Sequence, residues 1–452
     1  MIGLQSLDYS FLPRFARLAA VNTLSGIIIP VSGLVDIAFL GHLDDLNYLA
    51  GVSLSVLIFS YLYRAVDFLK SSTNAVTAQA TGTNDPELVL ATLLRNGLIA
   101  LGIGGLILLL QYPIRVLAFN FLVGAPEVKE AAVSYFNFRI WAAPAVLVNF
   151  VLFGWLLGRE MNFVVVLLSV LQSIVHIAMA YFLILQWNWA SAGAGLSTVI
   201  SQYAVCLVGL IIATFYTQWN QFSSAMSEIF NWKAFRTIFQ LNANISVTSL
   251  AQISTYAIFI NLSSALGTEV LAENSVLMEA SIIILMLQGI GFATQSLVGN
   301  FKGQESTELF KPLLIIATAV TLVIAIPLSS AYICFPKTLF GLFTNHDDIL
   351  EQISNYVIWL LPFEVSQAIA IVLQGYLIGL TESTPLRNAT LLRLGVVFLP
   401  FSVIAWYTQS NHMLWLAISL SSIIYVLILG IKIVNTFSVS LDIRLPTSEV
   451  SD

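Results

Sequence analysis

Apolar and polar positions alternate along this chain on the scale of whole helices, with long apolar runs separated by short polar stretches. A run of about 20 apolar residues matches the length of a helix that crosses a bilayer. About twelve such runs predict an all-α integral membrane protein. We place the spans near residues 18–40, 48–69, 88–111, 131–157, 163–186, 191–217, 238–262, 271–297, 311–334, 352–380, 388–409 and 413–437.

Composition supports the same class. Of the 452 residues, 58% are hydrophobic and only 9% are charged, whereas a soluble domain carries about 25% charged residues. The net charge of −6 gives no reason to expect a nucleic-acid partner. Cys206 and Cys334 lack the spacing of a metal site, and we expect neither a metal nor a cofactor. The first apolar run is too long for a cleaved signal peptide, so we expect it in the mature protein.

Basic residues predict the orientation, because cytoplasmic loops are enriched in Lys and Arg. With the N-terminus inside, the outer loops contain only Arg115, Lys129 and Lys337. The cytoplasmic segments then hold Arg14, Arg17, Lys70, Arg159, Lys233, Arg236, Lys302, Lys311, Arg387, Arg393, Lys432 and Arg444. We therefore expect both termini in the cytoplasm of a cell that carries the protein in its cytoplasmic (inner) membrane.

The chain also repeats itself at a constant offset in residue number. The matching pairs are Tyr135 with Tyr356, Gly154 with Gly375, Gly158 with Gly379, and Gly82 with Gly303. Six spans per half is an even number, so both halves enter the membrane from the same side, and the repeat is parallel, with a pseudo-twofold axis along the membrane normal. We predict a six-helix lobe over 1–217, a cytoplasmic linker over 218–236, and a second lobe with a short tail over 237–452. The GxxxG pairs are typical of helix packing.

Asp36 is the most unusual polar residue, because it lies inside the apolar stretch GLVDIAFLGHL. An ionised Asp at the centre of a bilayer costs about 3 kcal/mol. The positions one helical turn away hold Ser32, Gly33, Phe39 and Leu40, none of which is charged. A partner must come from another helix, or the carboxyl must be protonated part of the time. We favour a functional role for it.

Other polar residues inside the spans leave alternatives open. Arg64 and Asp67 are three residues apart and are predicted to form a structural pair. His176 is either a satisfied core residue or, near a carboxylate, a proton relay. Glu279 and Glu364 are either pathway residues or structural partners. We expect Arg95 and Arg139 to pair or to reach the interface, and Glu273 to be solvated near the outer end of its span.

No enzyme signature is present, and the protein is not expected to be an enzyme. The four histidines are scattered, and the sequence contains no HExxH, P-loop or GxGxxG motif. Without an ATP site, uphill transport has to draw on an ion gradient.

Several motifs together resemble one family of transporters. GLVDIAFLGHL, YLAGVSL, FLKSSTNAVTAQATG, LAENSVLM, SLVGNFKG and GYLIGLTESTPLRN are similar to the multidrug and toxic compound extrusion (MATE) family, in particular its DinF-like branch. The resemblance covers about residues 14 to 435. It implies a monomeric, two-lobe, twelve-helix antiporter that expels small organic compounds in exchange for protons or sodium ions.

The resemblance also implies roles for residues. The carboxylate of the first span, here Asp36, takes part in ion coupling in the family, together with Thr198 and Tyr135 at the matching positions. Family members place an Asn and an Asp where this chain has His176 and Ala180. Losing those oxygens weakens a sodium cage, whereas an imidazole beside Asp36 suits a proton.

The second half departs from the family pattern as well. Two LDG triplets of the family read LQG here, so Gln288 and Gln374 replace the two aspartates. Gln295 replaces a glutamate that follows in the family pattern. We take Glu279, Gln288, Glu364 and Gln374 as candidates for the substrate cleft. The first proline of span 1 is replaced by Val21, which puts a bend of that helix in doubt.

The leading hypothesis is a secondary antiporter that exports a cationic or amphiphilic organic compound in exchange for a cation, with the proton favoured. Alternatives are a sodium-coupled exporter and a flippase for lipids or lipid-linked sugars, although the extra spans and basic cavity of many flippases are missing. A membrane enzyme lacks a catalytic constellation, and the two-lobe repeat argues against a channel.

Overall fold

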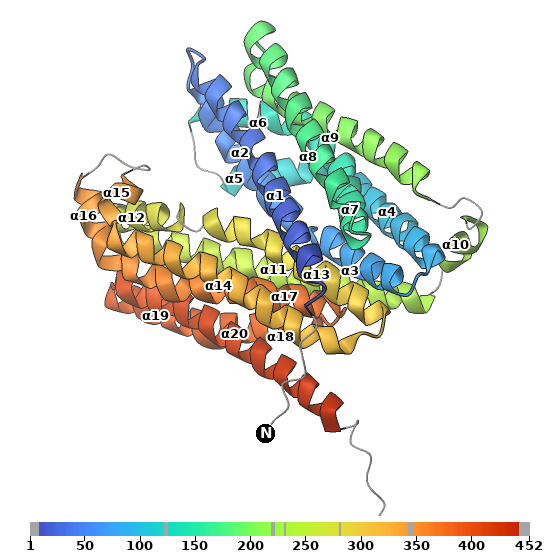
Figure 1. Ribbon diagram of the computed structural model, residues 1–452. Coiled ribbons are helices and arrows are strands. Elements are labelled where there is room, and N and C mark those ends of the chain that lie inside the picture. Colours follow the sequence, from blue (N-terminus) through green and yellow to red (C-terminus); the bar gives the residue numbers. More distant parts are fainter. Residues whose placement is uncertain are drawn as a thin grey trace, which may run out of the picture. The chain divides into compact units, whose positions relative to one another are not determined.

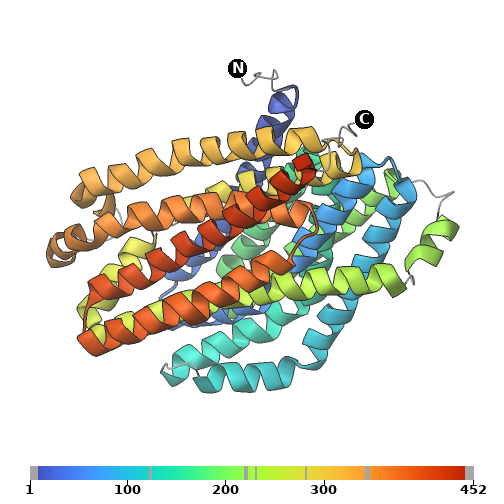
Figure 2. The ribbon, with the colours of Figure 1, turned by 90° about the horizontal axis from the view of Figure 1, so that it is seen from below.

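The computed structural model describes residues 9–121, 125–217, 222–229, 232–279, 282–341 and 347–442. Within these ranges every regular element is a helix, and no strand is formed (Figures 1 and 2). The first-half helices are α1 (Leu12–Gly41), α2 (Asn47–Arg64), α3 (Phe68–Gly82), α4 (Pro86–Leu109), α5 (Gln111–Phe121), α6 (Pro126–Arg139), α7 (Ala143–Gly158), α8 (Asn162–Ala180), which continues as a short π-helix (Tyr181–Gln186), α9 (Ala190–Phe215) and α10 (Phe222–Ile229).

The second-half helices are α11 (Trp232–Leu266), α12 (Thr268–Glu279), α13 (Ile282–Gly303), α14 (Phe310–Cys334), α15 (Pro336–Phe340), α16 (Asp347–Tyr356), α17 (Leu360–Gly379), α18 (Thr384–Leu392), followed by a π-helix (Arg393–Phe398), α19 (Leu399–Thr408) and α20 (Asn411–Asp442). Among the described residues, eleven helical stretches are long and apolar enough to cross a membrane. The remaining predicted span, 271–297, falls on α12 and α13, between which residues 280 and 281 lie outside the described part. The predicted all-α membrane fold is confirmed.

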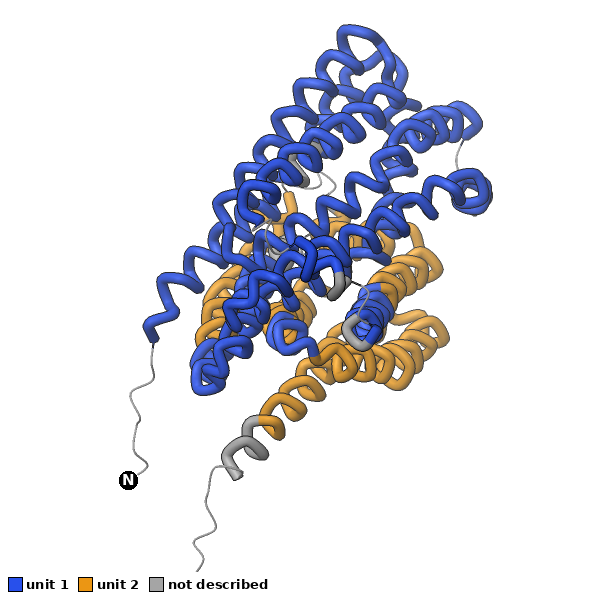
Figure 3. Tube along the Cα trace, turned by 90° about the vertical axis from the view of Figure 1, so that its right-hand side faces the viewer, with its two compact units in different colours: residues 1–249, 285–315, 375–381 blue, residues 250–284, 316–374, 382–452 orange. Residues whose placement is uncertain are grey.

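Two compact units can be distinguished, and each is described by itself (Figure 3). Unit 1 comprises residues 1–249, 285–315 and 375–381, and unit 2 comprises residues 250–284, 316–374 and 382–452. The two six-helix lobes that the sequence predicts stay a prediction.

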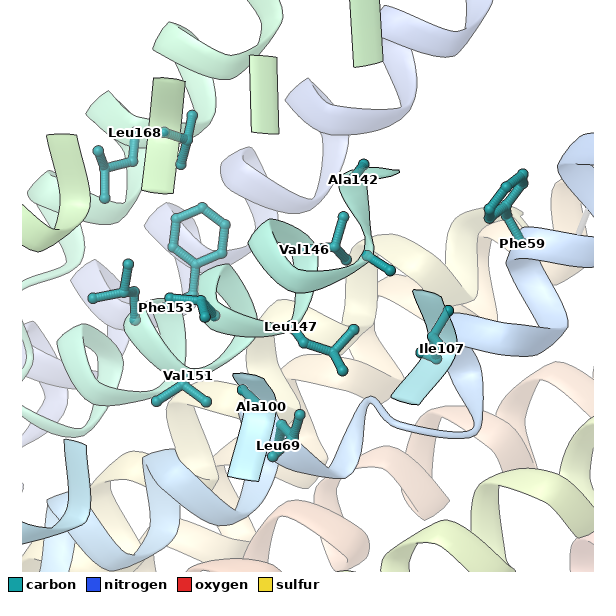
Figure 4. Packing of buried hydrophobic residues seen from close by; sticks show 14 of the residues in the cluster. Phe59, Leu69, Ala100, Ile107, Ala142, Val146, Leu147, Val151, Phe153 and Leu168 are labelled. Atoms are coloured by element: carbon teal, nitrogen blue, oxygen red, sulfur yellow. The ribbon is translucent and has the colours of Figure 1, made fainter. Parts of the chain in front are cut away.

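The core of unit 1 is built around α7. Its sequence, APAVLVNFVLFGWLLG, is apolar on all sides, as expected for a helix with no lipid-facing stripe. It packs against α3, α4 and α9, and nearly all of its residues are buried. Figure 4 shows Val146, Leu147 and Val151 of this helix in a cluster with Leu69 and Ala100.

Unit 2 combines an aromatic core with a buried amide network. Phe259 of α11 packs edge-on against Trp415 of α20, with ring centroids 5.2 Å apart. Asn274 of α12 donates to Ser263 at 2.7 Å and to Asn411 at 2.8 Å, and it accepts from the indole N–H of Trp415 at 2.8 Å. Because the amide bonds to two other helices, it fixes their register.

The predicted repeat is visible in how α7 and α17 pack. A Cβ on Gly154 would overlap the carbonyl oxygen of Lys70, and a Cβ on Gly375 would overlap that of Gly291, whose number differs from that of Lys70 by the same offset. The second glycine of each pair behaves in the same way: Gly158 lies against Asn74 and Gly379 lies against Gln295. The GxxxG pairs therefore pack helices in both halves, as the sequence predicts.

Backbone conformation repeats at the same offset. Seven non-glycine residues of the described part have positive φ, and six of them form three pairs separated by this offset. The pairs are Asn84 with Glu305, Glu160 with Thr381, and Asn188 with Gln409. Left-handed backbone is uncommon for such residues, so its recurrence at one spacing shows that equivalent turns of the two halves share a backbone conformation.

Candidate functional site

Asp36 and His176 meet in the interior of unit 1. Asp36 lies on α1 and His176 on α8, two helices that pack against each other (Figure 1). Nε2 of His176 is 3.0 Å from Oδ1 of Asp36. The side chain of His176 is 6% exposed and that of Asp36 is 9% exposed, so the pair is almost fully withdrawn from solvent. The partner that Asp36 requires comes from another helix.

A polar stripe on α8 positions the imidazole. Ser169, Gln172, Ser173 and His176 are all buried, and their spacing of three and four residues places them on one face of the helix. Ser173 donates to the carbonyl oxygen of Ile28 on α1 at 3.1 Å. The stripe therefore turns toward α1, and His176 is held opposite Asp36.

Tyr135 and Thr198 lie in the same region. Tyr135 of α6 is fully buried, and its side chain is hydrogen-bonded to that of Thr198 on α9. Thr198 also donates to the carbonyl oxygen of Ala194 at 3.2 Å. Asp36 is close enough to Tyr135 for an electrostatic interaction. The structure thus brings together the four residues that the sequence assigns to ion coupling.

Arg139, which the sequence predicts to pair or to reach the interface, is a further member of this group. Its guanidinium donates to the hydroxyl of Tyr135 and lies 4.9 Å from the centroid of the Phe59 ring. Its charge interacts with that of Asp36. Nε of Arg139 is buried and has no hydrogen-bond partner among the described residues. The spacing of four residues between Tyr135 and Arg139 on one helix is the signal that points to it.

The donor set of this site is poor in oxygen. Ala180, where a family carboxylate is expected, contributes a buried methyl group. Among the described residues no group of three or more His, Cys, Asp and Glu side chains is arranged to hold a metal ion. The contact between an imidazole nitrogen and a carboxylate oxygen can hold one proton on either atom.

Arg64 and Asp67 are adjacent but are not on one helix. α2 ends at Arg64 and α3 begins at Phe68, and Nη1 of Arg64 is 3.7 Å from Oδ2 of Asp67. Ser249 of α11 also donates to Asp67 at 3.2 Å. The arginine side chain is 47% exposed, so this pair is weaker than a buried one.

The four cleft candidates are held in different ways. The hydroxyl of Ser329 is hydrogen-bonded to the carboxyl of Glu364 at 2.6 Å, and Gln374 is hydrogen-bonded to Tyr425. Gln288 is half-buried on α13, and the side chain of Glu279 lies outside the described residues. The structure therefore gives Glu364 and Gln374 separate partners.

The structure also shows the surroundings of Gln295 and Glu273. Gln295 donates its amide to the carbonyl oxygen of Ser71 at 2.7 Å, a bond that a carboxylate could not make. Glu273 is 1% exposed, so the expectation that it is solvated is wrong. The cause is the packing of α12 against α16, which removes this end of the helix from solvent.

The family can now be identified. The family model MatE matches the chain twice, at residues 23–182 and 245–404. The chain belongs to the MatE family. The starts of the two matches differ by almost the same offset as the repeat of the chain, and the sequence resemblance to this family is confirmed. Members are multi-pass membrane transporters, not enzymes.

Several individual proteins are also similar to this chain over most of its length. DNA damage-inducible protein F of Escherichia coli (strain K12) is 32% identical over 405 residues, covering 89% of this chain and 88% of that protein. A probable multidrug resistance protein NorM of Bacillus subtilis (strain 168) is 20% identical over 360 residues, covering 78% and 79%. A solved structure of an outward-facing multidrug resistance MATE family transporter superposes with a TM-score of 0.85 at 18% identity, covering 94% and 95%. At that identity the superposition establishes the fold alone.

Proposed function

We propose that this MatE protein is a secondary antiporter of the cytoplasmic membrane that exports a small organic compound in exchange for protons. The observation that carries the proposal is the buried contact of 3.0 Å between His176 and Asp36. One proton can bridge the two groups, and its loss or gain changes the charge of the site by one unit. Both termini are proposed to be cytoplasmic, and the transporter to work as a monomer.

A proton fits this site better than sodium does. A selective sodium site needs several oxygen ligands, and here an imidazole and the methyl of Ala180 occupy two of the positions concerned. Arg139 adds a fixed positive charge that interacts with Asp36 and opposes binding of a second cation. One charge moving through about 100 mV supplies roughly 2.3 kcal/mol, enough for about a fifty-fold concentration ratio.

The transported compound is proposed to be cationic or amphiphilic. The support is the name of several relatives, multidrug resistance protein, and the polar candidates Glu279, Gln288, Glu364 and Gln374 in the second half of the chain. Glutamines at two of these positions reduce the negative charge of a cleft, which favours amphiphilic compounds over small multivalent cations.

Reconstituted liposomes test the coupling ion. The purified protein is placed in vesicles loaded with ethidium, a fluorescent organic cation, and either a pH gradient at equal sodium or a sodium gradient at equal pH is imposed. We expect export with the pH gradient and none with the sodium gradient. Export that follows sodium at fixed pH and ignores the pH gradient would contradict the proposal.

Two variants assign the effect to the site. Asp36→Asn should insert normally, since an amide costs less than a charge in lipid, and should lose gradient-driven export. His176→Ala should move the pH optimum of export while leaving ethidium binding intact. Wild-type export by Asp36→Asn would exclude this carboxylate from coupling.

A further inference from the structure

Glu364 is a buried acid in unit 2 that the Asp36 site does not use. It lies on α17 and is 2% exposed. Its Oε2 is 2.6 Å from the hydroxyl oxygen of Ser329 on α14. Its Oε1 is buried and has no hydrogen-bond partner in the described part of the chain. An ionised carboxylate can accept several hydrogen bonds, and among the described residues this one has a single hydroxyl within hydrogen-bond distance.

Counting hydrogens at Ser329 indicates where the proton is. The serine oxygen lies 2.6 Å from Glu364 and 2.8 Å from the carbonyl oxygen of Ala325. A serine has one hydrogen to donate. If Glu364 were ionised, both neighbours would be acceptors and only one contact could be a full hydrogen bond. If Glu364 carries a proton, it donates to Ser329, and Ser329 donates to Ala325, so both contacts are satisfied.

The surrounding charges favour the same state. No ion pair to Glu364 is formed within the described ranges, and Tyr332, on α14 near Ser329, interacts with it electrostatically. A buried carboxylate without a cation is costly and usually becomes neutral instead. The neutral acid leaves only the carbonyl oxygen Oε1 unpaired, which costs less than an unpaired charge.

A proline gives this site a way to open. Pro327 lies inside α14, two residues before Ser329. A proline within a helix leaves the carbonyl four residues earlier without its usual N–H partner. α14 is therefore more easily distorted beside the acid, where entering water would need to reach it.

We propose that Glu364 is a second proton-binding site of the transporter, protonated while buried and releasing its proton to water when the site opens. In that step the carboxyl O–H bond breaks, the carboxylate keeps the electron pair, and the proton goes to a water molecule; the reverse step restores the acid. The inference rests on the proposed proton coupling for its role in transport. The protonation state itself does not depend on that proposal.

Infrared spectroscopy of the full-length protein in lipid nanodiscs tests the inference. At neutral pH we expect a carbonyl stretch of a protonated carboxyl that is absent in Glu364→Gln and present in Asp36→Asn. Ser329→Ala should shift the frequency of this band, because it removes the hydrogen-bond acceptor. Glu351→Gln is the matched control, since Glu351 is an exposed acid of unit 2 and should contribute only carboxylate bands.

Hydrogen–deuterium exchange and a pH titration of this infrared band complete the test. The band should shift after transfer to heavy water and disappear reversibly as the pH is raised. The inference is overturned if Glu364→Gln removes no such band at neutral pH, or if the band neither shifts in heavy water nor titrates. Export that ignores a pH gradient would instead contradict the proposed function and leave the infrared result unchanged, so the two can fail separately.

Discussion

Arg139 shapes the electrostatics of the Asp36 site. It is held by Tyr135 and lies over the Phe59 ring, so its position is fixed by two neighbours. Its positive charge interacts with that of Asp36. The residue therefore adds a fixed charge to the site from a second helix.

Replacing Arg139 should change the pH dependence of export. In Arg139→Gln the ionised form of Asp36 loses its positive neighbour, and the proton leaves only at higher pH. We expect the export optimum to move upward by on the order of one pH unit. The measurement is the initial rate of ethidium export from liposomes across a pH series.

Arg139→Lys is the control for this variant, because it keeps the charge and loses only the planar fork of donors. Its profile should remain within a few tenths of a pH unit of the wild type. An unchanged profile in Arg139→Gln would show that the arginine serves only the packing of α6.

At the scale of single residues, the sequence identifies unusual polar residues better than it identifies the groups that they contact on other helices. Asp36 stands out because a carboxylate in an apolar run is costly, and His176 because it replaces a family amide. Arg139 is predicted only to pair or to reach the interface, because its interaction with Asp36 on another helix is one that no local pattern encodes. For the same reason Ser329 could not be paired with Glu364 from the sequence.

At the scale of helices, hydropathy locates the spans but misjudges buried polar helices. The sequence predicts that the second span ends at residue 69, yet α3 continues to Gly82 through the polar sequence SSTNAVTAQATG. Its polar side chains face other helices: Gln79 donates to the carbonyl oxygen of Gly379 at 2.7 Å, and Ser296 donates to Asn74 at 3.0 Å. Hydropathy cannot distinguish such a helix from a solvated loop.

Close helix packing gives a stability prediction. Gly154→Ala would push a Cβ into the carbonyl oxygen of Lys70, and Gly375→Ala would do the same to Gly291. Because both obstacles are backbone atoms, relief requires the helices to separate, and we expect each variant to lose about 1–3 kcal/mol of stability. The measurement is the melting temperature of the purified protein in detergent.

Gly102→Ala is the matched control, because a Cβ at that position meets nothing within 4 Å. Alanine also favours a helix over glycine by about 1 kcal/mol, so this variant should melt at or slightly above the wild-type temperature. Equal melting of Gly154→Ala and Gly102→Ala would contradict the packing role.

At the scale of the whole molecule, the repeat predicts which loops share a side of the membrane. The left-handed positions Asn188 and Gln409 mark one pair of equivalent turns, and Asn84 and Glu305 mark another. In a parallel repeat the two members of each pair lie on the same side of the membrane, whereas in an inverted repeat they lie on opposite sides. The sequence predicts the parallel arrangement because each half contains an even number of spans.

Single cysteines test this arrangement and the orientation together. In a background without Cys206 and Cys334, cysteines are placed beside the left-handed residues, at exposed positions 83, 304, 187 and 408. A membrane-impermeant maleimide applied to intact cells should label Trp187→Cys and Thr408→Cys. It should reach Thr83→Cys and Gln304→Cys only after the membrane is permeabilised. Labelling of one member of a pair without the other would refute the parallel repeat, and labelling of the opposite pair in intact cells would reverse the predicted orientation.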